Sequence, residues 1–357
     1  MNGKRILNVM LAAGQGGLET MGARYHMALR AAGAKVLSVG APDGWMATAM
    51  AASGLEFAPL KARFGGDPLA AMQLKALAKS FQADLVIAHG NRAISLGASP
   101  LSGLAHKTVA VAHNFRAKGS MGGIRAALCV SAAVETAIKA RFPRLETRRM
   151  ENFGPLSVYP VKPSPTAKPG GIPTPPVIGS LGRLHRNKGF DVLLDAAALL
   201  KARTEGEDHQ VTFSLNLAGD GPERAALEAK AEQLGLGGIV HFVGWTRDPG
   251  RYLQGLDLFL LPSRVEPFGL VVAEAMAAGV PVISSNIDGP RDILDGGELG
   301  LLVPPEDPDA LCDAMMAVFA DWDLALRRAR AAQDTATGRY SLDQGQARLC
   351  AVLDGLA

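Results

Sequence analysis

Cysteine and aromatic side chains are scarce in this sequence of 357 residues. Its three cysteines, Cys129, Cys312 and Cys350, lie far apart among apolar neighbours, which favours reduced core thiols over disulfides or a metal site. No pair of histidines or cysteines has metal-ligand spacing, so we expect no bound metal and no cofactor. Aromatic residues make up 5% of the chain and do not interleave with basic residues, so no nucleic-acid partner is expected.

Long hydrophobic runs are also absent. No stretch of eighteen uncharged apolar residues exists, which argues against a transmembrane helix. The N-terminus passes from Lys4 and Arg5 directly into a strand-like segment without a cleavage-type site, so we expect a cytoplasmic protein. The apolar content of 48% is enough to fill two cores.

Acidic residues are few in the first half of the chain. Residues 1–155 hold 19 Lys and Arg against 8 Asp and Glu, whereas residues 156–357 hold 18 against 26. Much of the basic excess falls late in the first half, at Arg116, Lys118, Arg125, Lys139, Arg141, Arg144, Arg148 and Arg149. Such a surface is expected to attract an anionic membrane or an anionic acceptor; a merely solvated basic face is the alternative.

Both halves of the chain alternate short β-branched runs with helical patterns, which is typical of βα units around buried parallel sheets. The predicted strands are 6–13, 35–40, 55–59, 84–89, 108–113 and 127–130, then 177–180, 211–217, 239–243, 256–261, 280–284 and 299–303. We expect helices within 307–332 and from Tyr340 onward. Seven prolines between 160 and 176 predict an extended linker. The predicted domains are therefore 1–159 and 177–339, with 160–176 between them.

Two glutamates, Glu266 and Glu274, stand eight residues apart in a segment that reads as a helix start. Pro267 suits a first helical turn, which predicts carboxylates roughly 12 Å apart along one helix. The amides of Phe268, Gly269 and Leu270 are then available to a phosphate between them. Because carboxylates accept hydrogen bonds from hydroxyls, a nucleotide sugar suits this layout. Two unrelated surface glutamates are the alternative.

Cations occur in a second loop, in the string Gly182-Arg183-Leu184-His185-Arg186-Asn187-Lys188-Gly189-Phe190-Asp191. The guanidinium of Arg183 can bind a diphosphate through two N–H groups, and the ammonium of Lys188 can bind it as a compact charge. Charged side chains exposed on a turn are the ordinary interpretation of such a string.

These strings resemble the retaining glycosyltransferases of family 4 (group 1), which have the GT-B fold. The family carries Ser…Glu-x-Phe-Gly…Glu-Ala-Met-Ala-x-Gly-x-Pro-Val and Gly-Arg-Leu-x-x-x-Lys-Gly-x-Asp, and all of these letters occur here, the first string ending at Val282. The resemblance implies two Rossmann-like doubly wound parallel-sheet domains facing across a cleft. It also implies that the C-terminal helix, 340–357, crosses back to the N-terminal, acceptor-binding domain, while 177–339 bind the donor.

The resemblance further assigns roles to single residues. Arg183 and Lys188 hold the diphosphate, Glu266 the sugar hydroxyls and Glu274 the ribose, while Gly219 and the segment from Gly244 lie near the base. In the family, no metal is generally bound. Trp245 follows a predicted strand, which favours packing over stacking on a base. The segment 286–292 resembles a turn of the family but differs from it at two positions, with Asp288 in place of glycine and Asp292 in place of glutamate. The contribution of this turn to ligand binding is therefore left open.

The glycine loop after the first strand, 14–19, is expected to open the first helix and approach a phosphate or a sugar. A dinucleotide fingerprint fails, because Glu19 replaces the last glycine of G-x-G-x-x-G. The loop instead resembles the family's Gly-Gly-x-Glu, with matches at Gly16, Gly17 and Glu19. We expect Gly17 to contact the donor, and Gly16 and Glu19 the acceptor.

Histidines end two predicted strands of the first half, where open α/β sheets present ligand-facing residues. His113 matches a histidine that the family commonly carries near the reacting sugar, although a lone histidine is often structural. His89 and Arg92, together with Arg116 and Lys118, are candidates for contacting an acceptor. The expected catalytic set is Glu266, His113, Arg183 and Lys188.

We therefore expect a retaining glycosyltransferase that uses a nucleoside diphosphate sugar, with UDP favoured over GDP. The basic first half favours a lipid-linked or lipopolysaccharide-type acceptor at the inner face of the cytoplasmic membrane, as in core or envelope polysaccharide assembly. Transfer to a soluble sugar, a hydrolase or epimerase on the same fold, and a non-catalytic nucleotide-sugar binding protein are the alternatives.

Overall fold

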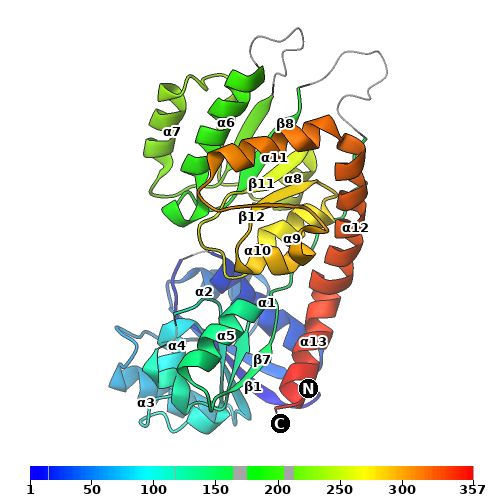
Figure 1. Cartoon of the computed structure of the whole chain (residues 1–357). Helices are drawn as coiled ribbons and strands as arrows, with labels where there is room; N and C mark the ends of the chain where they lie inside the picture. Colours follow the sequence, from blue (N-terminus) through cyan, green and yellow to red (C-terminus); the bar gives the residue numbers. More distant parts are fainter. Residues whose placement is uncertain (15, 117, 164–174, 205–212, 357) are drawn as a thin grey trace. The chain divides into compact units, whose positions relative to one another are not determined.

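The computed structural model describes residues 1–14, 16–116, 118–163, 175–204 and 213–356, and its elements are labelled in Figure 1. Internal contacts separate the chain into two compact units, residues 1–154 with 341–357 and residues 155–340. Most of the predicted linker at 160–176, and the start of the strand predicted at 211–217, lie outside the described residues.

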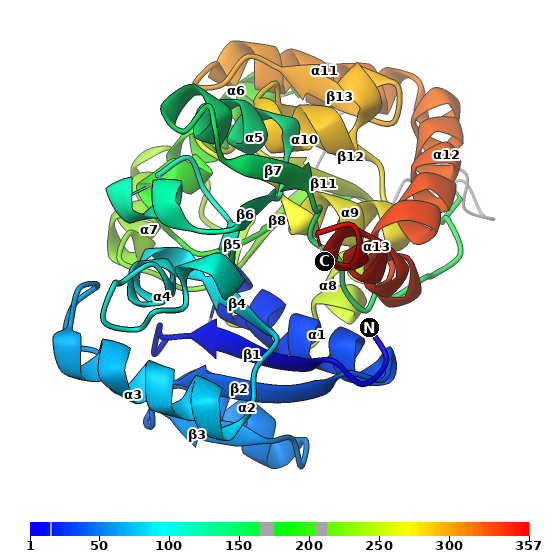
Figure 2. The same cartoon turned by 90° about the horizontal axis from the view of Figure 1, so that it is seen from below.

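Unit 1, residues 1–154 with 341–357, is built on a seven-stranded parallel sheet ordered β3-β2-β1-β4-β5-β6-β7 (Figure 2). Its strands are β1 (Arg5–Met10), β2 (Lys35–Gly40), β3 (Phe57–Pro59), β4 (Leu85–His89), β5 (Thr108–Ala112), β6 (Ala126–Cys129) and β7 (Glu146–Arg149). Its helices are α1 (Gly17–Ala31), α2 (Trp45–Ala52), α3 (Pro68–Ser80), α4 (Gly90–Gly97), α5 (Ala132–Arg141) and α13 (Leu342–Asp354), with 3₁₀ turns at Ala105–Lys107 and Gly119–Gly123. The strand order reverses between β1 and β4, where open α/β sheets form their ligand crevice.

Unit 2, residues 155–340, has a six-stranded parallel sheet ordered β10-β9-β8-β11-β12-β13. Its strands are β8 (Val177–Leu181), β9 (Ser214–Ala218), β10 (Val240–Gly244), β11 (Leu258–Leu261), β12 (Val282–Ser285) and β13 (Leu301–Val303). Its helices are α6 (Phe190–Thr204), α7 (Arg224–Gln233), α8 (Pro249–Gly255), α9 (Leu270–Ala277), α10 (Asp288–Ile293), α11 (Pro308–Ala320) and α12 (Trp322–Tyr340), with 3₁₀ turns η4 (Arg186–Lys188) and η5 (Asp295–Gly297).

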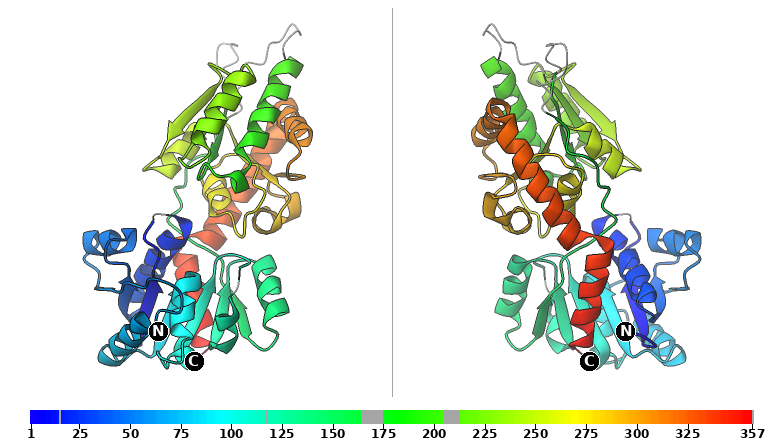
Figure 3. Two further views of the ribbon diagram at one scale, coloured as in Figure 1. Left: turned by 90° about the vertical axis from the view of Figure 1, so that its left-hand side faces the viewer. Right: turned by 90° about the vertical axis from the view of Figure 1, so that its right-hand side faces the viewer.

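The core of unit 2 explains its strand sequences. Helices α6, α7 and α11 bury leucines against one face of the sheet, while α8 and α9 pack on the other. Helix α12, orange-red in both views of Figure 3, packs on α9. With both faces covered, the strands consist of continuous apolar runs, which is the pattern that the sequence shows.

Most predicted strands are confirmed within two residues at each end, but β7 is missed. Its sequence, Glu-Thr-Arg-Arg, carries no apolar run because β7 is the edge strand of unit 1, and only Thr147 of its four residues is buried. Charged residues are common on edge strands because they discourage pairing with another sheet.

Helix α13 joins unit 1 through a close contact. It packs on α1, and Ser341 bridges Gly154 just before the helix begins. A Cβ atom at Gly345 would lie 2.0 Å from the Phe153 ring, so this helix position requires glycine. Phe153 in turn stacks on Tyr25 of α1.

Candidate functional site

Loops of unit 2 that follow β8, β9, β11 and β12 meet at the carboxyl edge of the sheet, where doubly wound folds bind ligands. Backbone hydrogen bonds join them. Gly182 N–H donates to Ala218 O at 3.0 Å, Leu184 N–H to Asp220 O at 2.9 Å, and Gly219 N–H to Gly244 O at 2.7 Å. The strings Gly182–Asp191 and 218–223, far apart in the sequence, therefore form one surface.

Glycines allow these loops to approach closely. Gly219 has φ +129°, and a Cβ atom there would lie 1.8 Å from Gly182 O. A Cβ at Gly189, with φ +67°, would lie 1.9 Å from Pro262 O. A Cβ at Gly289 would lie 2.2 Å from Phe268 O. No side chain fits at any of these three positions, so the glycines of the motifs are required by backbone packing.

Lys188 and Glu266 form an ion pair across two of these loops. Lys188 Nζ donates to Glu266 Oε2, and the two side chains are 25% and 12% exposed. An ammonium has three N–H donors, so after this bond Lys188 retains two for a bound phosphate. Arg183 lies nearby in sequence on the same loop; it is exposed and, among the described residues, makes no ion pair. Arg183 and Lys188 are thus both able to meet an anion.

Arg264 holds the loop after β11 in place, a role that the sequence analysis missed. Its guanidinium donates to both carboxylate oxygens of Asp191 at 2.7 Å and to Glu306 Oε1 at 2.7 Å. These bonds raise the pKa of Arg264, and Arg264 lowers the pKa of Asp191. Asp191 is a letter of the motif string that contains Lys188, but no pattern in the sequence links it to Arg264.

The prediction that Glu266 begins a helix is wrong. Helix α9 starts at Leu270, because Gly269 precedes it with φ +93° and the left-handed region cannot continue a right-handed helix. Glu266 lies in the preceding loop, and only Glu274 lies on α9, so a spacing of roughly 12 Å along one helix no longer applies. Within the described residues, no hydrogen bond occupies the N–H groups of Phe268, Gly269 or Leu270.

Trp245 follows Gly244, at the end of β10. The expectation that it packs in the interior is wrong, because its side chain is 59% exposed. Gly244, immediately before it, has a φ of +79°. Asp288 and Asp292 lie on α10, whose first turn meets the loop of Glu266 through the bond from Gly289 N–H to Glu266 O at 3.3 Å.

Unit 1 has its own glycine loop at the carboxyl end of β1. Gly16 is the N-cap of α1, which begins at Gly17, as predicted. Glu19 lies in the first turn of α1 and is only 9% exposed. A Cβ at Gly90, the residue after β4, would lie 3.6 Å from Leu18, so the loop lies beside the end of β4.

A chain of buried polar side chains crosses the interior of unit 1 toward this edge. His113 Nε2 and His89 Nδ1 lie 3.2 Å apart, and His89 Nε2 and Asn8 Oδ1 lie 2.9 Å apart. Asn8 Nδ2 lies 3.2 Å from Ser38 Oγ, which lies 2.8 Å from His26 Nδ1. His89 is 1% exposed and uses both ring nitrogens, so the prediction that it contacts an acceptor is wrong. His113, at the end of β5, is half-buried.

Burial keeps these histidines neutral. It lowers the pKa of His113 from 6.5 to about 4. It also lowers the pKa of His89, and repulsion from His113 when that ring is protonated lowers the pKa of His89 further. Burial, with a contribution from Arg30, lowers the pKa of His26 to about 4.

Acidification is therefore expected to destabilise unit 1 below pH 6.5. Unfolded histidines bind protons through this range while the folded ones do not, so stability is present above pH 6.5 and is lost as the pH falls toward 4. For His26 the loss between pH 7 and pH 5 is roughly 2 kcal/mol. Urea unfolding at both pH values measures it. His26→Gln should reduce the difference, and an unchanged difference in that variant would contradict the assignment to His26.

The basic residues late in the first half are less free than the sequence suggested. Lys139 and Arg149 lie at 2.8 and 3.9 Å from Glu135, and Arg148 lies 2.7 Å from Glu146. Arg125 donates to the backbone of Leu356. The remaining four basic residues of this group are exposed: Arg116, Lys118, Arg141 and Arg144. Arg92, another residue expected to contact the acceptor, is also exposed and donates to Leu11 O at 3.5 Å. The continuous basic surface expected from these eight residues is thus partly neutralised.

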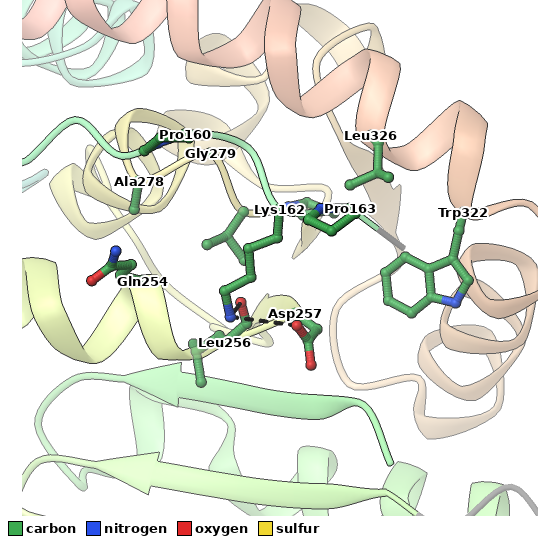
Figure 4. Close-up of a pocket in the computed structure, with 12 residues that line it drawn as sticks. Pro160, Lys162, Pro163, Gln254, Leu256, Asp257, Ala278, Gly279, Trp322 and Leu326 are labelled. Carbon is green, nitrogen blue, oxygen red and sulfur yellow. Dashed lines mark hydrogen bonds and ion pairs between the residues drawn. The ribbon is translucent and has the colours of Figure 1, made fainter. Parts of the chain in front are cut away.

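A hollow of unit 2 lies beside Lys162, Asp257 and Trp322 (Figure 4). Lys162 Nζ donates to Leu256 O at 3.0 Å, and Asp257 Oδ2 accepts from Val177 N–H at 2.9 Å. Asp257 precedes β11 and Val177 begins β8, so the hollow lies at the amino edge of the sheet, opposite the glycine loops. It is therefore separate from the candidate ligand site.

The described residues contain neither a membrane-spanning helix nor a metal-binding cluster. No helix there is both long and apolar enough to cross a bilayer. No group of three or more His, Cys, Asp or Glu residues in the described ranges is arranged to hold a metal ion.

Residues 166–335 match the family model described as "Glycosyl transferases group 1". The lipopolysaccharide core biosynthesis glycosyltransferase LpsE of Rhizobium meliloti is 36% identical over 166 residues, which are 46% of each chain. A D-inositol 3-phosphate glycosyltransferase of Corynebacterium urealyticum is 40% identical over 176 residues, 48% of this chain and 41% of that protein. The matches thus span about half the length of these relatives.

Among solved structures, Anabaena Alr3699/HepE in complex with UDP and glucose superposes with a TM-score of 0.82 at 22% identity, over 98% of this chain and 99% of that one. This likeness, with the two parallel sheets, confirms the predicted α/β GT-B fold. Together with the family match, it supports a group 1 glycosyltransferase.

Proposed function

We propose that this chain is a glycosyltransferase of family 4 that transfers a sugar from a nucleoside diphosphate sugar with retention of configuration. The observation that carries the proposal is the Lys188–Glu266 pair beside the exposed Arg183, at the carboxyl edge of the unit 2 sheet. The family match at 166–335 includes all three residues.

Charge development on the leaving diphosphate is the step that these residues assist. Arg183 supplies a planar fork and Lys188 supplies a point charge, and both stabilise negative charge most where water is excluded. The N–H groups of Phe268, Gly269 and Leu270 add neutral donors. In this proposal the protein cations balance the diphosphate, so neither a metal ion nor a cofactor takes part.

The carboxylates of Glu266 and Glu274 accept hydrogen bonds from hydroxyl groups of the donor. Glu266 lies in the loop that leads into α9 and accepts hydrogen bonds from the transferred sugar, while Glu274, on α9, binds the ribose. Gly219 and Gly244, joined at 2.7 Å, lie beside the base, and the exposed Trp245 is available to stack on it. Gly17 in unit 1 contacts the donor, and Gly16 and Glu19 contact the acceptor. UDP is favoured because the solved relative binds UDP.

A panel of UDP-, GDP- and ADP-sugars tests the donor site. Ligand binding raises the apparent melting temperature, and slow donor hydrolysis reports chemistry. Stabilisation and hydrolysis with one donor are expected. Stabilisation without hydrolysis or transfer would favour a non-catalytic binding protein, and silence across the panel would overturn the donor site. The anomeric configuration of the product, read by NMR, decides between retention and inversion.

For the acceptor we propose a lipid-linked or lipopolysaccharide-type molecule at the inner face of the cytoplasmic membrane. LpsE, a relative, is named for lipopolysaccharide core biosynthesis. Helix α3 and the loop before it carry exposed apolar side chains, at 54% for Phe64, 62% for Leu69 and 57% for Met72. Exposed lysines on the same segment are Lys61, Lys75 and Lys79. Apolar side chains with lysines around them are typical of surfaces that lie on anionic bilayers.

Binding to vesicles of anionic phospholipid is expected to depend on this segment and to weaken as salt is raised. Replacing Leu69 and Met72 with serine should lower the vesicle-bound fraction about tenfold in a sedimentation assay, because two exposed apolar side chains that would enter the bilayer are lost. Met316→Ser, at an exposed apolar position of α11 in unit 2, is the matched control and should bind as the unsubstituted chain does. Equal binding by both variants would contradict a role for α3, and no binding at any salt would favour a soluble sugar acceptor.

A further inference from the structure

We propose that Asn8 and His89 are positioning residues that hold His113 as the Nε2–H tautomer, so that His113 Nδ1 accepts a hydrogen bond from a hydroxyl of the bound sugar. The identity of the ligand as a sugar rests on the proposed function. The tautomer itself follows from the hydrogen bonds inside unit 1.

The carbonyl oxygen of Gly22 determines how the side-chain amide of Asn8 is oriented. Asn8 Nδ2 lies 2.7 Å from Gly22 O and 3.2 Å from Ser38 Oγ. A carbonyl oxygen accepts and never donates, so the NH₂ group of Asn8 must face Gly22. The amide oxygen of Asn8 is thereby directed at His89 Nε2, 2.9 Å away.

The orientation of the Asn8 amide determines which ring nitrogen of His89 carries the proton. Because the amide oxygen only accepts, His89 Nε2 must carry the proton. His89 is 1% exposed, and no carboxylate pairs with it among the described residues, so the ring is neutral and its Nδ1 has a lone pair. Tyr25 packs edge-on against the ring, with 4.9 Å between the two ring centroids.

The proton on His89 in turn determines the tautomer of His113. His89 Nδ1 accepts, so His113 Nε2, 3.2 Å away, must donate. A neutral His113 then has its lone pair on Nδ1. The two rings lie 5.5 Å apart between centroids and 26° from parallel, which keeps the donor directed inward.

The free lone pair selects the chemical class of the ligand. Within the described residues, no hydrogen bond occupies His113 Nδ1, and His113 follows β5 at the carboxyl edge of the sheet. An unprotonated ring nitrogen, with its lone pair, repels a phosphate oxygen and accepts a hydrogen bond from a hydroxyl group. His113 is therefore suited to a sugar hydroxyl and unsuited to a phosphate.

Long-range ¹H–¹⁵N NMR of histidine-labelled full-length protein tests the assignment without any substrate, because the two ring nitrogens of each neutral tautomer have distinct shifts. His113 is expected as the Nε2–H tautomer at pH 6 to 8. Observation of the Nδ1–H tautomer, or of an imidazolium, would overturn the proposal. The result is independent of transfer activity, so a failure of the proposed function would leave the tautomer intact, and a wrong tautomer would leave the donor site intact.

Two substitutions of His89 separate positioning from packing. In His89→Gln the amide can donate to Asn8 and accept from His113, so the tautomer and the transfer rate should be retained within about threefold. His89→Leu removes both bonds, so His113 should populate both tautomers and kcat/KM should fall about tenfold, the equivalent of one hydrogen bond. If His89→Leu does not fold, the glutamine variant and the unsubstituted spectrum decide. A glutamine variant that folds but shows the other tautomer of His113 would contradict the relay.

Discussion

Replacing Glu266 with glutamine is expected to lower the rate of sugar transfer by about a hundredfold or more, while the chain folds normally. The amide oxygen of glutamine can still accept from Lys188, so the loop keeps its contact with the 3₁₀ turn of Lys188. In the proposed function, the substitution removes the negative charge that accepts hydrogen bonds from the sugar hydroxyls. The magnitude is that of removing one positioned charge-stabilising contact, and kcat/KM with the identified donor measures it.

Glu228→Gln is the matched control for this substitution. Glu228 also pairs with a cation, at 2.8 Å from Arg224 Nε, but it lies on the partly exposed surface of α7. Loss of an exposed ion pair has little effect on stability, so transfer should stay within about twofold of the unsubstituted rate. Normal transfer by Glu266→Gln would remove Glu266 from the catalytic set, and equal losses in both variants would point to a general effect of charge.

Replacing Gly219 with alanine is expected to reduce the free energy of unfolding of unit 2 by about 3 kcal/mol or more and to abolish donor binding. The added Cβ would lie 1.8 Å from Gly182 O, and the φ of +129° is unfavourable for any side chain. Relief requires the loops after β8 and β9 to separate, which moves Arg183 away from the turn beside Gly244. Urea unfolding and thermal shift with the donor measure the two effects.

Gly238→Ala isolates the contribution of the close approach. Gly238 also has a positive φ, +79°, but no atom lies within 4 Å of its Cβ position. Its substitution should therefore cost only the backbone strain, about 1 kcal/mol, and leave donor binding unchanged. Equal destabilisation by the two substitutions would show that strain alone, and not loop packing, requires glycine at 219.

The secondary structure was largely predictable because both sheets are buried on two faces. Strands such as Thr108–Ala112 and Leu258–Leu261 are continuous apolar runs, and helix α11 begins where Asp307 and Pro308 indicated, with the Asp307 carboxylate accepting from Ala310 N–H at 2.9 Å. Prediction failed where the backbone leaves these patterns. Strand β7 lies at an edge and has no apolar face, and α9 is delayed by the left-handed Gly269.

The candidate site was predictable as a set of residues, but not as a set of contacts. Motif letters selected Arg183, Lys188 and Glu266, because a family resemblance depends on identity and spacing alone. The ion pair between Lys188 and Glu266 joins positions 78 residues apart, and no local pattern reports it. The support that Arg264 receives from Asp191 and Glu306 was hidden for the same reason.

By itself the sequence determined the two βα series, the glycines of the loops and the residue types able to bind a nucleotide sugar, since periodicity and motif spacing are local properties. Only the tertiary structure decided which polar groups meet. His89 became an interior residue and His113 the half-buried end of a directed chain of hydrogen bonds, because burial and donor–acceptor complementarity depend on strands β1, β4 and β5 lying side by side.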